Sequence, residues 1–216
     1  MLYSVLRAIV RPIVYLLFNI KFVGLENISD DGGFIICSNH RSFLDPVMIA
    51  VGIKNRKLRI MAKQELFKNK ILAAFFTSIG AFPVNRGKGD LGAIKKAEEI
   101  VEDKNVLLIF PEGTRSKSGR PLRPKSGAAH IASDAGADVV PAAICYDGKG
   151  LAFRKKVTVC FGAPIKNEQL KISETNRAED SRRVSALIME KIVELLNQHL
   201  SKPVDCPVSS GTHKDD

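Results

Sequence analysis

Apolar runs alternate with helical patterns along this chain, and that alternation limits its fold more than any other feature. Each apolar run has the length of a buried strand and part of it is β-branched; the five runs are 34–37, 58–62, 106–110, 139–145 and 157–161. The segments with helical patterns are 46–53, 64–79, 90–103, 126–135 and 176–200. Strands that alternate with helices predict one α/β domain, with a mostly parallel or mixed sheet flanked by helices on both faces.

The N-terminal segment, residues 1–20, predicts one more helix. Arg7 and Arg11 lie four residues apart and therefore on one helical face, while aliphatic side chains cover most of the remainder. The longest charge-free run, 12–20, is too short to span a bilayer, which takes about 20 apolar residues. Such a helix either lies in the plane of a membrane interface or packs on the protein's own core. We favour the interfacial arrangement, followed by the α/β domain at 21–200 and a flexible tail at 201–216.

The net charge of +10 predicts an acidic partner. Eight lysines and arginines lie from Lys54 to Arg86 against one acidic residue, Glu65, and they are interleaved with leucine, isoleucine and phenylalanine. An ordinary solvated face would account for such a stretch. Apolar residues beside cations suit an anionic membrane surface better than nucleic acid, and the chain carries no familiar nucleic-acid-binding motif. We therefore expect a peripheral membrane protein at the cytoplasmic face, with reduced cysteines and no nucleic-acid partner.

Polar segments follow apolar stretches at three points where strands are expected to end, after 35–37, after 81–84 and after 106–110. The first contains His40 and Asp45, the second contains Arg86, and the third is 111–116. Because the carboxyl ends of parallel strands meet at one edge of a sheet, these side chains are expected to converge. A base, a carboxylate and two arginines brought together suit acid–base chemistry on an anionic substrate.

The pair formed by His40 and Asp45 has two interpretations. In one, the imidazole is a general base and the carboxylate orients it. In the other, His40 is a loop residue without a task, and Asp45 is the N-cap of a helix with Pro46 at its first position. A carboxylate has two oxygens, so capping and orienting do not exclude each other.

Four short motifs resemble those of the glycerolipid acyltransferases, in the order and spacing of that family. They are NHRSFLD (39–45), FPVNR (82–86), FPEGTRS (110–116) and VVPAAI (139–144), and the resemblance covers about residues 20–165. It implies the family's α/β acyltransferase fold and transfer of an acyl chain to a lysophospholipid hydroxyl. The donor would be an acyl-CoA or acyl carrier protein thioester, and the acceptor the sn-2 hydroxyl of lysophosphatidate. Glycerol-3-phosphate or another lysolipid is the alternative acceptor, and a non-catalytic module that binds acidic lipid or nucleic acid is the alternative outside the class.

The resemblance also implies roles for individual residues. The motif histidine of the family is a general base, which implies that His40 takes the proton of the acceptor hydroxyl while Asp45 stabilises the imidazolium. The positions that match the family's acceptor-binding residues are Arg86, Glu112, Gly113, Thr114 and Arg115.

Among these positions, the arginines are expected to bind phosphate, because guanidinium groups grip it bidentately. Glu112 is expected to orient an arginine or to accept a hydrogen bond from a glycerol hydroxyl. Backbone amides around Gly113 are candidate oxyanion donors. Apart from the acyl thioester as co-substrate, no cofactor and no metal are expected.

Overall fold

The computed structural model describes residues 2–53, 56–84, 91–146, 148 and 153–208. Within them, seven strands form one sheet in the order β1-β7-β6-β2-β5-β3-β4. The strands are β1 (Phe18–Val23), β2 (Phe34–Ser38), β3 (Leu58–Lys63), β4 (Ala81–Val84), β5 (Val106–Ile109), β6 (Val139–Tyr146) and β7 (Lys155–Phe161). Neighbouring strands are parallel except β6 and β7, which are antiparallel. The predicted mostly parallel, mixed sheet is confirmed.

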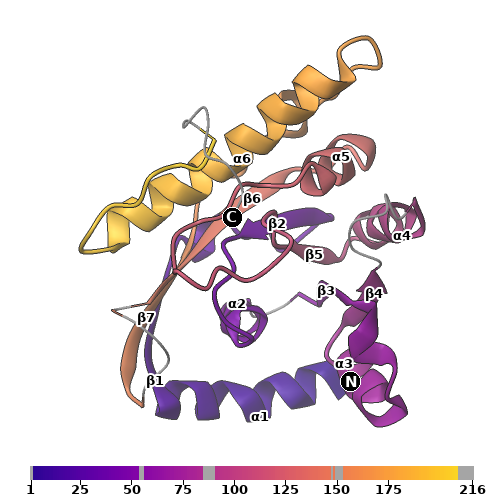
Figure 1. Ribbon diagram of the computed structural model, residues 1–216. Coiled ribbons are helices and arrows are strands. Elements are labelled where there is room, and N and C mark those ends of the chain that lie inside the picture. The colour runs from indigo at the N-terminus through magenta and orange to yellow at the C-terminus, as the bar shows by residue number, and fades with distance from the viewer. Residues whose placement is uncertain (1, 54–55, 85–90, 147, 149–152, 209–216) are drawn as a thin grey trace.

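Helices cover both faces of this sheet, as Figure 1 shows. The helices α1 (Leu2–Leu17), α2 (Asp45–Gly52) and α3 (Lys70–Ser78) lie on one face. The helices α4 (Leu91–Glu102), α5 (Gly127–Asp134) and α6 (Arg177–His199) lie on the other. Three single-turn helices, η1 (Leu25–Asn27), η2 (Gln64–Phe67) and η3 (Asn167–Gln169), occur in the connections.

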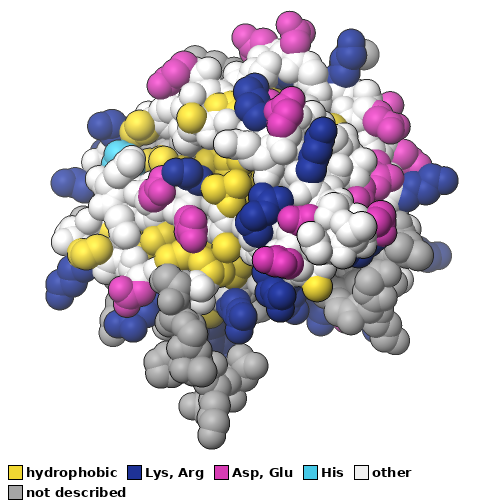
Figure 2. Space-filling view, turned by 90° about the horizontal axis from the view of Figure 1, so that it is seen from above, with side chains coloured by type: hydrophobic (Ala, Val, Ile, Leu, Met, Phe, Trp, Pro, Cys, Tyr) yellow, Lys and Arg dark blue, Asp and Glu magenta, His cyan; other side chains and the backbone are white. Residues whose placement is uncertain are grey.

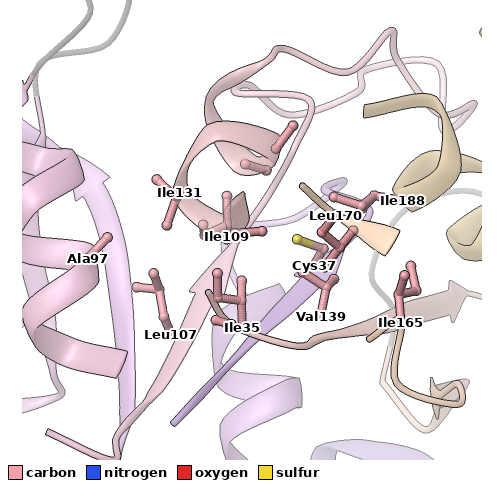
Figure 3. Close-up of a cluster of buried hydrophobic side chains, with 14 of the residues drawn as sticks. Ile35, Cys37, Ala97, Leu107, Ile109, Ile131, Val139, Ile165, Leu170 and Ile188 are labelled. Atoms are coloured by element: carbon pink, nitrogen blue, oxygen red, sulfur yellow. The ribbon is translucent and has the colours of Figure 1, made fainter. Parts of the chain in front are cut away.

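The alternation of side chains along β2 divides the apolar core into two layers. Ile35 and Cys37 point into the layer beneath α4, α5 and α6, part of which Figure 3 shows. Phe34 and Ile36 point into the layer shared with α1 and α2. Successive side chains of a strand face opposite sides of the sheet, so a strand buried on both faces appears as a continuous apolar run. This explains why the sequence marks β2 so clearly.

Two strands, β1 and β4, are absent from the five predicted runs. β1 begins at Phe18, directly after the helix α1, so residues 18–20 are strand and not the end of the predicted N-terminal helix. β4 contains Pro83, which cannot donate a hydrogen bond to a neighbour and is tolerated here because β4 is an edge strand. The predicted helix at 64–79 is also divided, into η2 and then α3, whose N-cap Asn69 accepts hydrogen bonds from two backbone amides.

Helix α1 packs on the core and also exposes an apolar face. Val14 is buried, and the Arg7 guanidinium donates a hydrogen bond to the carbonyl of Ile53 at 2.5 Å. On the outer side, exposed fractions run from 48% to 64% for four aliphatic residues, Val5, Ile9, Ile13 and Leu16. Of the helices that the structure describes, none combines the length and the apolar character needed to cross a membrane.

The segment after α6 is anchored over its first part. Val204 and Cys206 pack against the core, and the Asn197 side chain bonds to both the N–H and the carbonyl of Val204. Val204 and Cys206 are therefore held in place next to α6, while the flexibility of the whole segment 201–216 stays a prediction. Residues 209–216 lie outside the described part of the chain.

Candidate active site

Polar residues gather at the carboxyl ends of three adjacent strands, β6, β2 and β5. His40 follows β2, the segment 110–116 follows β5, and Tyr146 ends β6. Because these three strands are parallel, their ends share one edge of the sheet. Two of the three predicted polar segments are thus brought together. The third segment, with Arg86, lies outside the described residues.

The side chains of His40 and Asp45 form a buried pair. His40 Nδ1 lies 2.8 Å from Asp45 Oδ2, and Asp45 is 0% exposed. Asp45 Oδ2 also accepts hydrogen bonds from the backbone N–H groups of Arg41 at 2.6 Å and Ser42 at 2.7 Å. Its other oxygen, Oδ1, accepts one from the Tyr146 hydroxyl at 2.5 Å. These bonds suit an ionised carboxylate, which can be buried only when it is fully paired.

The helix-cap interpretation of Asp45 is wrong. α2 begins at Asp45 itself, and its N-cap is Leu44, which has no side-chain capping bond. The hydrogen bonds of the Asp45 carboxylate go to the loop before the helix and to β6, and none of those within the described residues goes to an amide of α2. The carboxylate therefore orients the imidazole, and the first turn of α2 adds a favourable helix dipole.

The Asp45 contact determines which His40 nitrogen can act as a base. Since an ionised carboxylate only accepts, Nδ1 carries the proton and donates it, and in the neutral imidazole this leaves Nε2 with its lone pair. No residue that the structure describes forms a hydrogen bond with Nε2, and the His40 side chain is 11% exposed. In that neutral form, the ring presents an unprotonated nitrogen at the edge of the sheet.

The segment 110–116 holds His40 at three points. The Phe110 ring stacks on the imidazole with a centroid distance of 4.0 Å. Glu112 Oε1 accepts a hydrogen bond from the His40 N–H at 2.7 Å, and the His40 carbonyl accepts one from the Ser116 N–H at 2.7 Å. The third predicted motif therefore fixes the position of the first.

Glu112 has a structural position that its place in the motif does not predict. It is 2% exposed, and its second oxygen accepts a hydrogen bond from the Leu122 N–H at 2.9 Å. Burial raises the pKa of Glu112 to about 7, against the opposing effect of its two backbone hydrogen bonds. A carboxylate buried in this way is not placed to meet a glycerol hydroxyl. Its contacts instead support the loop that carries His40.

Tyr146 and Asn39 complete the site, and neither is a predicted site residue. Burial, followed by the nearby charge of Asp45, raises the pKa of Tyr146, so the phenol keeps the proton that it donates. Asn39 bonds to the backbone of Ile144 through both ends of its amide, which joins β2 to β6 beside the pair. The sequence signal for Asn39 is its place in NHRSFLD, whereas nothing local connects Tyr146 with a residue 101 positions earlier.

A pocket of about 520 Å³ lies next to the residues that hold the His40–Asp45 pair: neither member of the pair lines it, but Arg41, Ser42 and Tyr146, which bond to Asp45, do. It is lined by Arg41, Ser42, Phe43, Thr114, Arg115, Ser116, Lys117 and Tyr146. Three of these residues are cations and none is acidic, so the pocket suits an anion. The Arg115 guanidinium lies 3.4 Å from the centroid of the Phe43 ring, a cation–π contact that positions it. The predicted residues Thr114 and Arg115 are both part of this pocket.

The predicted oxyanion donors need one correction. The Gly113 N–H donates a hydrogen bond to the Phe110 carbonyl at 3.0 Å and closes a turn, in which Gly113 has a φ of 69°. That amide is therefore not available to a substrate. The backbone amides of Thr114 and Arg115, by contrast, donate to no residue within the described ranges.

Metal ligands are not concentrated at this site. Over the described part of the chain, no group of three His, Cys, Asp or Glu side chains is placed to hold a metal ion. The pocket lining offers cations, hydroxyl groups and two aromatic rings.

Comparison with known proteins agrees with this architecture. The Acyltransferase family model matches residues 19–145. This range contains all four motifs and every predicted site residue. A 1-acyl-sn-glycerol-3-phosphate acyltransferase of Bacillus subtilis is 32% identical over 190 residues, which cover 87% of this chain and 94% of the relative. One of Streptococcus pneumoniae is 33% identical over 178 residues, which cover 79% of this chain and 65% of the relative.

The fold has a counterpart among solved structures. The crystal structure of the 1-acyl-sn-glycerophosphate (LPA) acyltransferase PlsC from Thermotoga maritima matches with a TM-score of 0.66. Its sequence is 22% identical, and the match covers 88% of this chain and 75% of that one. With the family model and the Bacillus relative, these findings assign the chain. It belongs to the acyltransferase family that includes the 1-acyl-sn-glycerol-3-phosphate acyltransferases.

Proposed function

We propose that this protein transfers a fatty acyl chain from an acyl-CoA or acyl carrier protein thioester to the sn-2 hydroxyl of lysophosphatidate, giving phosphatidate. The observation that carries the proposal is the His40–Asp45 pair, with His40 Nε2 open, beside a pocket lined by three cations and no acid. A base beside an anion site suits deprotonation of a hydroxyl on a phosphate-bearing acceptor. The names of the similar proteins support the same acceptor.

The reaction would proceed by direct transfer. His40 Nε2 takes the proton of the acceptor hydroxyl while the hydroxyl oxygen attacks the thioester carbonyl carbon. A C–O bond forms, the C–S bond breaks, and the imidazolium returns the proton to the departing thiolate. Asp45 stabilises the imidazolium between these steps. Ser42 is not needed as a nucleophile, and its Oγ accepts a hydrogen bond from the Leu44 N–H.

Developing charge on the carbonyl oxygen needs hydrogen-bond donors. The amides of Thr114 and Arg115 are the candidates, because both residues line the pocket and Ser116, next in the chain, bonds to His40. Donors held in place before reaction stabilise a tetrahedral intermediate without reorganisation. The segment 110–116 would then both hold the base and stabilise the oxyanion.

The test of this function is an acceptor panel with the purified protein in detergent. Thiol release from acyl-CoA and from acyl carrier protein is followed with lysophosphatidate, glycerol-3-phosphate and other lysolipids. Release that depends on added lysophosphatidate supports the proposal. Thioester consumption with no dependence on any acceptor contradicts it, and binding of lipid without consumption favours a non-catalytic module.

Arg115 is expected to bind the acceptor phosphate. Arg115→Lys keeps the charge and loses the two-pronged geometry, and each charge-assisted hydrogen bond contributes about 1.5–3 kcal/mol. For Arg115→Lys we expect kcat/KM with lysophosphatidate to fall roughly 10- to 150-fold. We expect the same loss for Arg86→Lys, where the role of Arg86 is proposed from its motif alone. Thioester hydrolysis by water should change much less, since water has no phosphate. Equal losses in both reactions would assign the arginines to the fold or the donor.

We also propose peripheral binding to an anionic membrane at its cytoplasmic face. α1 and α3 lie on the same face of the sheet, and Tyr3 of α1 approaches Gly80 just beyond α3. On α3, Ile71 is 81% exposed, and Phe75 and Leu72 are about half exposed, beside Lys68 and Lys70. The opposite face, which carries α6, has acidic and basic side chains interspersed (Figure 2). Apolar side chains flanked by cations suit a bilayer interface.

Removing residues 1–20 would not test this proposal cleanly, because α1 packs on the core and residues 18–20 belong to β1. The double substitution Ile9→Glu and Leu16→Glu alters only the exposed face of α1. We expect binding to anionic vesicles, measured by sedimentation, to fall at least about tenfold, since each buried aliphatic side chain contributes about 1.5–3 kcal/mol. The control Thr175→Glu with Gln198→Glu adds the same charge near or on α6 and should bind like the unaltered protein. Unchanged binding in the α1 variant would contradict docking through this helix.

A further inference from the structure

Arg41 lies beside the His40–Asp45 pair, and its own backbone N–H is bonded to that pair. Its N–H donates to Asp45 Oδ2 at 2.6 Å, directly after His40 in the chain. Its side chain lines the 520 Å³ pocket, where the guanidinium carbon lies 5.4 Å from the centroid of the Tyr146 ring. Tyr146 in turn bonds to Asp45. The Arg41 guanidinium therefore lies at the side of the pocket where Tyr146 joins Asp45.

The chain leaves room for this guanidinium at Gly119. Gly119 has a φ of 81°, and a Cβ atom built on it would lie 2.7 Å from Arg41 Nη2 and 2.9 Å from Cζ. A side chain at this position would require the guanidinium to move from where it lies. The segment after FPEGTRS thus forms one wall against Arg41, with Tyr146 forming another.

The positive charge of the pocket has no acidic partner in its lining. Arg41, Arg115 and Lys117 come from two separate segments, and no ion pair of these three cations occurs among the described residues. Elsewhere among the described residues, six lysines and arginines form ion pairs with a carboxylate. Three cations gathered without a carboxylate favour a ligand of more than one negative charge.

We propose that Arg41 is a binding residue for the acceptor phosphate and makes the site selective for phosphomonoester over phosphodiester headgroups. This inference rests on the proposed acyltransferase function. A phosphomonoester carries about −1.5 to −2 charges at pH 7 and three terminal oxygens, so it can meet Arg115 and Arg41 together. A phosphodiester carries one charge and has two free oxygens, so it gains less from a second guanidinium.

The experiment compares Arg41→Gln and Arg41→Lys with the control Arg182→Gln, an exposed arginine of α6 that does not line the pocket. Acyl transfer is measured with 1-oleoyl lysophosphatidate and 1-oleoyl lysophosphatidylglycerol in the same detergent micelles. For Arg41→Gln we expect kcat/KM with lysophosphatidate to fall roughly 10- to 150-fold, mainly through KM. The phosphodiester acceptor should lose less than about threefold, and Arg41→Lys should lie between Arg41→Gln and the control. A similar loss on both acceptors, or variants that match the control, would overturn the inference.

A second readout separates this inference from the proposed function. Thermal stabilisation of each variant by lysophosphatidate, and by lysophosphatidylglycerol, reports binding without turnover. If the unaltered protein transfers no acyl chain to any lysolipid, the proposed function fails, and the stabilisation measurement alone decides the role of Arg41. Selective loss of stabilisation by lysophosphatidate in Arg41→Gln would support the site, and equal stabilisation of Arg41→Gln and the control would overturn it.

Discussion

Replacing His40 is expected to lower lysophosphatidate-dependent acyl transfer by about 10²- to 10⁴-fold or more, the contribution usual for a general base. In His40→Ala, no side chain is left to take the proton of the acceptor hydroxyl at the position of Nε2. The substitution also removes the ring that stacks on Phe110, so it opens a small cavity. His40→Gln is therefore made alongside His40→Ala, because glutamine fills more of the ring's volume and has an amide that can donate to Asp45.

The measurement is kcat/KM together with the temperature of thermal unfolding. His130→Gln is the matched control, because His130 is another partly buried histidine, whose Nε2 lies 3.3 Å from Ser181 Oγ on α6. We expect the control to keep its activity. Near-normal turnover in folded His40→Gln and His40→Ala would show that another group removes the proton.

Asp45→Asn is expected to cause a loss of about 10²- to 10⁴-fold, the second largest effect. Asparagine is nearly isosteric with aspartate. Its oxygen can still accept from the amides of Arg41 and Ser42, and its NH₂ group can donate to the Tyr146 oxygen. The hydrogen bonds can then be kept while the negative charge that stabilises the imidazolium is lost.

Tyr146→Phe separates charge from hydrogen bonding. It removes one bond to the Asp45 carboxylate and keeps the charge, so we expect a loss of less than about tenfold. Activity and thermal unfolding are measured for both variants. If Asp45→Asn lowers the unfolding temperature and leaves kcat unchanged, the carboxylate serves only the local structure.

The fold was predictable where strands are buried on both faces, and less so elsewhere. β2 and β6 lie inside the sheet, and their continuous apolar runs mark them directly. β1 escapes prediction because no turn residue separates Leu17 of the helix from Phe18 of the strand. β4 is absent from the five apolar runs, although a strand end is expected before Arg86, because its Pro83 is acceptable only at an edge and a single sequence does not reveal strand order.

The site was predictable as a set of residues, but the partners of those residues were not. A carboxylate before a proline is typical of a helix cap, and the actual partners of Asp45 include a tyrosine 101 residues away. Glu112 resembles a ligand-binding residue in sequence, yet it is buried against the His40 amide. In the sequence, Arg41 and Lys117 are typical of solvated charges, whereas in the structure their segments meet and both residues line one pocket.

The central claim is that this protein moves an acyl chain from a thioester to lysophosphatidate. Its most direct test supplies a ¹³C-labelled acyl thioester and lysophosphatidate to the purified protein, and measures released thiol and the position of label in phosphatidate by mass spectrometry. We expect about one labelled phosphatidate per thiol released, with the label at sn-2, and only background thiol release without the acceptor. Thiol release that does not require lysophosphatidate, or that yields no labelled phosphatidate, would contradict the claim.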